Sequence, residues 1–280
     1  MRAGFIGAGK VGFSLGRYLA GGGITVTGYY SRNSGSAREA AEFTGTDLYT
    51  DLAAITEDSD TLFITVPDGA IADVWQQLRD LPIKDKNICH CSGSISSTVF
   101  FDAEDKGAYA CSVHPIYAVS DRYESWKGLS GAVFSVEGST QCRDMMKDML
   151  ESIGNEAVVI DGSRKALYHC AAVMVSNYMA ALADTGIKML EECGFSRETA
   201  SRALAPLITG NAQAIASQGP EKALTGPVER GDCITVRKHL DVLEGQTKEL
   251  YRMLSDILVD IAERKHPGRN YDEMKKELQK

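Results

Sequence analysis

The sequence predicts an α/β chain: a Rossmann, doubly wound, mainly parallel sheet followed by an all-α C-terminal domain. Three observations predict this class. Short apolar runs alternate with helical stretches over the first 160 residues, as in βαβ units. A glycine motif joins the first run to the first helix. After residue 160 the pattern is helical only. We therefore expect a dinucleotide-binding domain at 1–160 and an all-helical substrate and dimerisation domain at 161–280.

Seven apolar runs, each short enough for one strand, predict a sheet in the first domain. These runs are Ala3–Ile6, Ile24–Tyr30, Thr61–Val66, Asn87–Cys91, Ala108–Val113, Ala132–Val136 and Ala157–Ile160. Four stretches have helical periodicity. They are Lys10–Ala20, Ser36–Phe43, Ala70–Leu78 and Cys142–Ile153. The alternation favours parallel strands joined by helices that cover both faces.

The second domain begins with an unbroken helical pattern that Gly194 is placed to end. The expected helices are Ser163–Cys193, Ser196–Ser217, Cys233–Leu243 and Gln246–Arg264, with a charged tail after Pro267. The middle of the first helix is apolar on every side. We therefore expect it to be buried, against other helices or against a second copy of the chain.

Composition narrows the class of function. The formal net charge is -8 at pH 7, and both nucleic acids and anionic membranes need a basic face. The N-terminus runs directly into a motif instead of a signal peptide. The apolar stretch Cys170–Ala183 is shorter than the roughly 18 residues of a membrane span. We expect a soluble, cytoplasmic protein.

The seven cysteines form no CxxC pair, so we expect reduced thiols rather than a disulfide framework. Cys89-His90-Cys91 is the one segment that resembles a metal motif. On a strand the two thiols share one face and His90 points to the other. We therefore interpret this segment as a buried strand and predict no metal site.

The motif Gly7-x-Gly9-x-x-Gly12 follows the first strand and opens a helix. In this position the first glycine permits the tight turn, the second admits the pyrophosphate, and the third allows helix–strand packing. The helix N-terminus then faces the phosphate charge. The alternative is a glycine-rich turn without a ligand. The expected cofactor contacts of this loop are Gly7, Gly9, Lys10, Val11 and Gly12.

The end of the second strand indicates NADP rather than NAD. An NAD site has a carboxylate about 20 residues after the glycines, whereas this sequence has Ser31-Arg32-Asn33. Arg32 can bind a 2′-phosphate bidentately, and Ser31 and Asn33 can add hydrogen bonds. The alternative is that Arg32 is an exposed loop cation.

Two further strand ends belong at the ligand edge of a parallel sheet. Val66 and Pro67 end one strand, and Ser92 and Gly93 follow another, so we expect all four to contact the cofactor. Plain turns are the alternative. His114 ends a later strand and is a candidate substrate contact, although a lone histidine there is as often structural.

The long helix carries a polar stripe that packing does not explain. Lys165 and His169 are four residues apart and share a face, to which Ser176 returns, with Asn177 at its border. Such a stripe suits carbonyl reduction, because a cation stabilises the developing oxyanion and an acid supplies the proton. We predict that Lys165, His169 and Asn177 are catalytic and that Ser176 binds substrate. The alternative is a solvated helix start with a satisfied histidine.

A later segment, Leu224–Asp232, is too rich in turn-forming residues for a helix interior. Asp232 is placed to cap the next helix. Thr225 and Arg230 are candidate substrate contacts, with Arg230 available for a carboxylate. A plain capped loop is the alternative.

Three segments together resemble a known family. They are the glycine motif, Lys165-Ala166-Leu167-Tyr168-His169 with Ser176-Asn177, and Thr225-Gly226-Pro227 through Arg230-Gly231-Asp232. The family is Rossmann-like, with a C-terminal domain long catalogued as one of unknown function. It is related to 6-phosphogluconate dehydrogenase, pyrroline-5-carboxylate reductase and ketopantoate reductase. The resemblance covers nearly the whole chain, and the last segment is its most specific part.

Some members of that family are an alternative type of ketopantoate reductase. The resemblance therefore implies NADPH-dependent reduction of 2-dehydropantoate, with Lys165 and either His169 or Asn177 in catalytic roles. His169 stands where ketopantoate reductases usually have asparagine, and their late glutamate motif is absent. Pyrroline-5-carboxylate reductase is the second interpretation, without that family's usual serine-proline-glycine-glycine-threonine-threonine run. A non-catalytic NADP-binding redox sensor is the third. We expect a homodimer through the C-terminal domains.

Overall fold

The computed structural model describes residues 1–280, which form two compact units, Met1–Met174 and Val175–Lys280. The first unit extends past residue 160, where the sequence predicts a boundary. It does so because helix α6 (Lys165–Val175) buries its first residue there. Lys165 is only 2% exposed and hydrogen-bonds to the carbonyl oxygen of Ser92.

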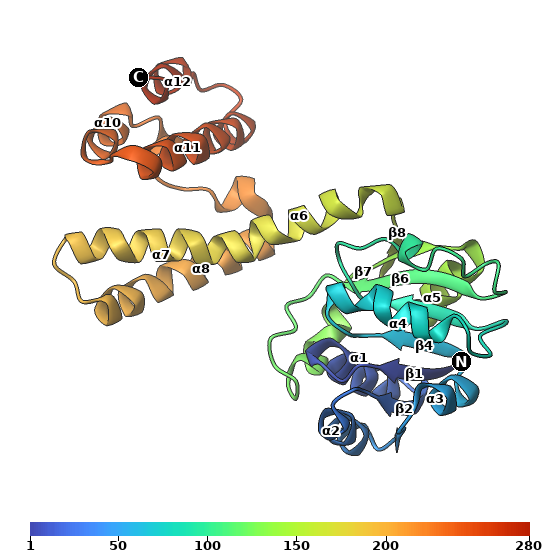
Figure 1. Ribbon diagram of the computed structural model, residues 1–280. Helices are drawn as coiled ribbons and strands as arrows, with labels where there is room; N and C mark the ends of the chain where they lie inside the picture. The colour runs from blue at the N-terminus through green and yellow to red at the C-terminus, as the bar shows by residue number, and fades with distance from the viewer. The chain divides into compact units, whose positions relative to one another are not determined.

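The first unit is built on one eight-stranded sheet in the order β3-β2-β1-β4-β5-β6-β7-β8 (Figure 1). Its strands are β1 (Arg2–Ile6), β2 (Thr25–Tyr30), β3 (Asp47–Leu48), β4 (Thr61–Ile64), β5 (Asn87–His90), β6 (Tyr109–Pro115), β7 (Phe134–Gly138) and β8 (Ala157–Val159). Only the β6–β7 pair is antiparallel. The predicted doubly wound, mainly parallel fold is therefore confirmed. Strand β3 is missing from the prediction because it has only two residues.

Five α-helices connect or follow these strands before α6. They are α1 (Lys10–Gly21), α2 (Ser34–Thr44), α3 (Leu52–Asp58), α4 (Ile71–Leu78) and α5 (Thr140–Ser152). Short 3-10 turns lie at η1 (Asp68–Ala70), η2 (Ser97–Val99), η3 (Ser125–Gly131) and η4 (Gly162–Arg164). Helix α3 was not predicted, since two turns give too short a periodic pattern.

Alternate residues of the strands pack into two apolar cores, one on each face of the sheet. Phe5 of β1 lies in a core with Leu15 of α1 and Met146 of α5. Ile64 of β4 lies in the other core with Trp75 of α4. This division by strand period explains why helices are needed on both faces.

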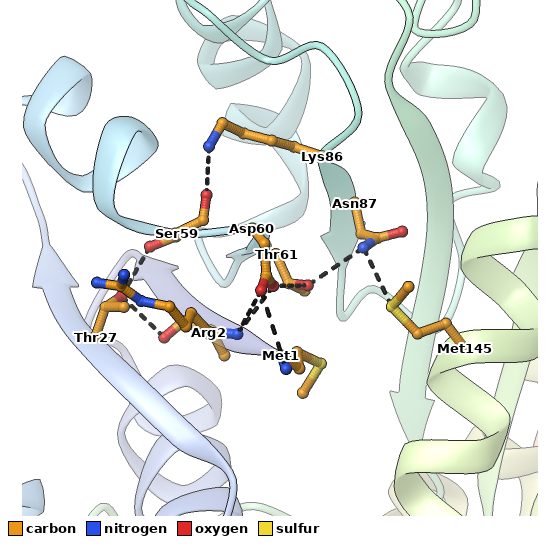
Figure 2. Close-up of polar contacts among 10 residues, drawn as sticks. Met1, Arg2, Thr27, Ser59, Asp60, Thr61, Lys86, Asn87 and Met145 are labelled. Atoms are coloured by element: carbon orange, nitrogen blue, oxygen red, sulfur yellow. Dashed lines mark hydrogen bonds and ion pairs between the residues drawn. The ribbon is translucent and has the colours of Figure 1, made fainter.

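The amino ends of the central strands are tied together by polar contacts, which Figure 2 shows. The carboxylate of Asp60 accepts from the backbone N–H of Arg2 at 2.9 Å, and Lys86 Nζ donates to the carbonyl oxygen of Ser59 at 2.6 Å. The hydroxyls of Thr27 and Ser59 lie 2.7 Å apart. These groups bond to one another, so this edge of the sheet is structural.

The second unit is all-helical, as predicted. Its helices are α7 (Asn177–Glu192), α8 (Arg197–Ala223), α9 (Pro227–Arg230), α10 (Cys233–Val242), α11 (Gly245–Lys265) and α12 (Asp272–Leu278). Figure 1 shows α7 and α8 side by side as an antiparallel pair. The segment after Pro267 is not a simple charged tail. It forms α12 because Tyr271, Met274 and Leu278 join the core of this unit.

The predicted single helix Ser163–Cys193 is in fact a 3-10 turn and two α-helices. The break is at Ser176, whose backbone angles of φ -112° and ψ -73° depart from helical values. Ser176 and Asn177 are types whose side chains compete with the helical backbone bonds, and the Ser176 hydroxyl lies 2.9 Å from Asn177 Oδ1.

The expected burial of this helical stretch is not found within one chain. Helix α7 has no buried residue, and the side chain of Val175 is 71% exposed. Within Gly162–Glu192, 31 residues that include α6 and α7, an 18-residue window has a mean hydropathy of 1.3 and is by length and composition alone able to span a membrane. This apolar window is longer than the stretch Cys170–Ala183 that the sequence indicates. An apolar surface of this size requires a partner of some kind.

Candidate functional site

The glycine loop has the conformation that a pyrophosphate requires. Gly7 has φ +106°, and a Cβ there would lie 2.7 Å from the carbonyl oxygen of Thr65. A Cβ on Gly12 would lie 2.3 Å from Thr65 Oγ1, so this position too must be glycine. Gly9 is open, with nothing closer than 3.8 Å, and precedes α1 without a side-chain cap. The first amides of α1, which include Lys10 and Val11, are thus free for an anion.

A cavity of about 220 Å³ extends from this loop along the carboxyl ends of β1, β2 and β4. Its lining includes Gly7, Gly9, Ser31, Arg32, Val66 and Pro67, six of the predicted cofactor contacts. Arg32 is exposed, and no carboxylate follows β2. Asn33 is placed differently: its side chain caps α2 by accepting from the N–H of Ser36 at 3.2 Å.

The next strand ends are joined through a carboxylate. Asp68 Oδ2 accepts from the hydroxyl of Ser92 at 2.9 Å and from the hydroxyl of Ser94 at 3.0 Å. Asp68 follows directly after the cavity residue Pro67. The ends of β4 and β5 therefore form one continuous edge beside the cavity.

Lys165 anchors the start of α6 to this edge. Its Nζ donates to the carbonyl oxygen of Ser92 at 2.7 Å and to Oγ of Ser112 at 2.5 Å. An ammonium has three N–H groups, so one remains for a further acceptor. Because the chain folds β6 beside β5, Ser112 and Ser92 reach the same amine.

Two imidazoles converge beside Lys165. A Cβ added to Gly93 would lie 2.8 Å from His169 Nδ1 and 2.9 Å from His114 Nε2. His169 Nδ1 is buried and makes no hydrogen bond in the structure. The other ring nitrogen of His114, Nδ1, lies 2.7 Å from the hydroxyl of Tyr168. Gly93 thus provides the space into which both rings project.

Burial and the local charges set the protonation of this group. Burial, with help from Lys165 and His169, lowers the pKa of His114 to about 4. Burial also lowers the pKa of Lys165, against the opposing effects of Glu137, Cys91 and Asp68. Burial raises the pKa of Tyr168. At pH 7 the tyrosine is therefore a neutral donor and His114 a neutral imidazole, with Nδ1 as acceptor and Nε2–H facing Gly93.

The structure thus brings together Lys165, His169, His114, Ser92 and Gly93, all in the first unit. The predicted residues Ser176, Asn177, Thr225 and Arg230 belong to the second unit and remain predictions. Thr225 and Arg230 are both exposed there. Asp232 caps α10 as expected, accepting from the N–H of Thr235 at 3.0 Å.

Sequence reasoning missed two residues of this site, Tyr168 and Ser112. Tyr168 lies between Lys165 and His169 in the chain. Its position next to two predicted catalytic residues was the sequence signal that could have identified it. Asp68 lies at a strand end where the sequence does predict ligand contacts, but its bonds to the hydroxyls of Ser92 and Ser94 are found only in the structure. Ser112 lies inside β6 between apolar neighbours, and no sequence signal marks it.

Comparisons with known proteins cover most of the chain. Residues 2–90 match the family described as "NADP oxidoreductase coenzyme F420-dependent". Residues 132–257 match a domain of unknown function, DUF2520. A search of the curated proteins finds no match.

Solved structures share the fold over nearly the full length. A protein from Thermotoga maritima is 28% identical, with 94% of this chain and 98% of that chain covered and a TM-score of 0.74. A Bacteroides fragilis protein named as an NADP oxidoreductase is 24% identical, with 92% of this chain and 98% of that chain covered and a TM-score of 0.71. A pyrroline-5-carboxylate reductase from Coxiella burnetii is 12% identical, with 94% of this chain and 97% of that chain covered and a TM-score of 0.62.

Proposed function

We propose that this chain, an NADP-dependent oxidoreductase that joins a domain of the NADP oxidoreductase family to a DUF2520 domain, reduces a 2-keto acid, most specifically 2-dehydropantoate to pantoate. The observation that carries the proposal is the donor group around Gly93. An ammonium, a phenol-linked imidazole and a second imidazole meet at the carboxyl end of β5, the strand next to β4, whose own end lines the cavity. Such a group suits one carbonyl oxygen that gains negative charge.

The residues present fit an NADP cofactor. Gly7 and Gly12 leave no room for a Cβ, whereas Gly9 does, and the free amides of α1 follow. Arg32 and Ser31 would hold the 2′-phosphate, and Val66 and Pro67 would contact the rest of the cofactor along the cavity. When bound, NADPH supplies the hydride.

The protein's own residues supply the charge and the proton. The third N–H of Lys165 is available to the carbonyl oxygen, and its charge stabilises the oxyanion. His114 Nε2–H is a second donor, held in its tautomer by the hydroxyl of Tyr168. His169, whose Nδ1 makes no hydrogen bond, completes the group. The predicted contacts of Arg230 and Thr225 with the carboxylate, and of Asn177 and Ser176 with the substrate, remain part of this proposal.

The test is the consumption of NADPH with a panel of small carbonyl compounds and cyclic imines. We expect the highest kcat/KM with 2-dehydropantoate, lower values with other branched 2-keto acids, and little turnover of pyrroline-5-carboxylate. A preference for the cyclic imine would overturn the substrate. A chain that binds NADPH and reduces nothing in the panel would instead favour the redox-sensor alternative.

We also propose that a second copy of the chain covers the apolar surface of α7 and α8, in a cytoplasmic homodimer. Leu182 of α7 and Leu207 of α8 are 44% and 62% exposed. The same helix pair carries the exposed ion pairs of Asp184 with Lys188 and Arg197. A membrane interior excludes such pairs, whereas an isologous contact can leave them at its rim. Light scattering should give twice the mass of one chain. A monomer, or a chain that partitions into lipid vesicles, would contradict this.

A further inference from the structure

Three cysteines from three separate elements meet in the apolar core of the first unit. Cys89 lies on β5, Cys111 on the neighbouring β6, and Cys142 in the first turn of α5. Their sulfurs lie within 4.8 Å of one another. The spacing of the three in the sequence has no motif, which is why the sequence predicts no metal here.

The three sulfurs form a compact triangle. Cys89 Sγ is 3.5 Å from Cys111 Sγ and 3.8 Å from Cys142 Sγ, and Cys111 and Cys142 are 2.9 Å apart. Metal–sulfur bonds of about 2.3 Å place three equivalent ligands roughly 4 Å apart around an ion. Two sides of the triangle are already close to that value, and the third must open by about 1 Å.

We propose that Cys89, Cys111 and Cys142 form a three-coordinate site for a soft monovalent metal ion, copper(I). This site is separate from the reductase site and goes beyond the proposed function.

The donor set and its surroundings select the ion. Only sulfur is offered, and thiolates favour copper(I), zinc or iron–sulfur clusters. Zinc takes four ligands in closed sites, whereas the group of His, Cys and carboxylate ligand atoms within 4.8 Å of one another has three members and no fourth.

The position of Cys142 favours its thiolate. It is the third residue of α5, within the turn where helix N–H groups and the dipole stabilise negative charge. The complete burial of Cys89, Cys111 and Cys142 (0% exposed) keeps competing ligands and oxidants away. Binding releases thiol protons to solvent without any change of oxidation state.

The test uses the full chain, with Cys170→Ser and Cys193→Ser removing the two exposed thiols. Copper(I) is supplied without oxygen, in competition with the chromogenic chelator bicinchoninate, over hours to allow opening of the core. We expect about one ion per chain, and X-ray absorption should count three sulfurs at about 2.3 Å. The unfolding temperature should rise with bound ion.

Cys142→Ser in this background should weaken copper(I) binding at least about tenfold. Cys91→Ser is the matched control, because Cys91 is a buried neighbour outside the triangle. Its affinity should be unchanged. Less than a fifth of an ion per chain, two sulfurs instead of three, tighter zinc binding, or equal losses in both variants would overturn the proposal, as would a Cys111–Cys142 disulfide in the purified chain. If Cys142→Ser fails to fold, the sulfur count decides.

Discussion

The hydroxyl of Tyr168 lies 2.7 Å from Nδ1 of His114 and so links helix α6 to the end of β6. The two rings meet edge to face, with centroids 5.6 Å apart. Because His114 is neutral at pH 7, the phenol is the donor in this bond. The pair therefore fixes which nitrogen of His114 carries the proton toward Gly93.

The first prediction concerns this pair. Tyr168→Phe keeps the ring but lets His114 choose the other tautomer, so kcat should fall about tenfold to a hundredfold. The dissociation constant of NADPH should stay the same. Single-turnover kinetics and a binding titration measure the two quantities. Tyr178→Phe, on the exposed surface of α7, is the control, and an equal loss there would refute the role.

The second prediction concerns Lys165. Lys165→Met should lower kcat about 10²–10⁴-fold, because it removes a charge that acts mainly in the transition state. NADPH binding should persist. The buried oxygens of Ser92 and Ser112 lose their donor, so the free energy of unfolding should also fall by about 1–3 kcal/mol. Steady-state kinetics and urea denaturation measure these effects, with the exposed Lys188→Met as control. Unchanged kcat would remove Lys165 from the mechanism.

Much of this arrangement could be predicted from the sequence, because it depends on local patterns. The glycine motif, the strand runs and the i, i+4 spacing of Lys165 and His169 each need only neighbouring residues. Tertiary partners could not be predicted in this way. Ser112 meets Lys165 only because β6 lies beside β5, and the break at Ser176 arises inside an otherwise helical pattern.

The third prediction concerns cofactor choice. Arg32 lines the cavity where a 2′-phosphate is expected, and no carboxylate directly follows β2, where NAD sites have one. NADPH should bind at least about tenfold more tightly than NADH, a difference of ~1.4 kcal/mol, and Arg32→Ala should erase most of it. Arg38→Ala removes the same charge from α2 outside the cavity and should leave the ratio unchanged. Equal affinities in the unaltered chain would refute the assignment.

The fourth prediction is a loss of stability in mild acid. Burial lowers the pKa of His90 to about 4. Below about pH 6.5 the unfolded chain takes up a proton that the folded chain does not, so stability is full above pH 6.5 and falls toward pH 4. The loss from this residue is on the order of 3 kcal/mol.

Denaturation between pH 7 and pH 4 measures this slope. His90→Asn keeps an acceptor for the N–H of Ser92 and should remove the His90 share of the slope, whereas the exposed His239→Asn should not change it. The share of His114, whose pKa is also lowered to about 4, should persist. An unaltered slope in His90→Asn would show that other groups control the acid response.

The last prediction concerns Gly93, where a methyl group would lie within 3 Å of nitrogens from both His169 and His114. Gly93→Ala must displace both rings, and a shift of about 1 Å in reacting groups can cost a hundredfold in rate. We therefore expect kcat to fall by about 10–10²-fold, with the fold intact by circular dichroism. Gly69→Ala is the control, because a Cβ there meets nothing within 4 Å. If Gly93→Ala instead weakens NADPH binding and leaves kcat unchanged, Gly93 contacts the cofactor, as its place after β5 suggests, and the imidazoles do not act there.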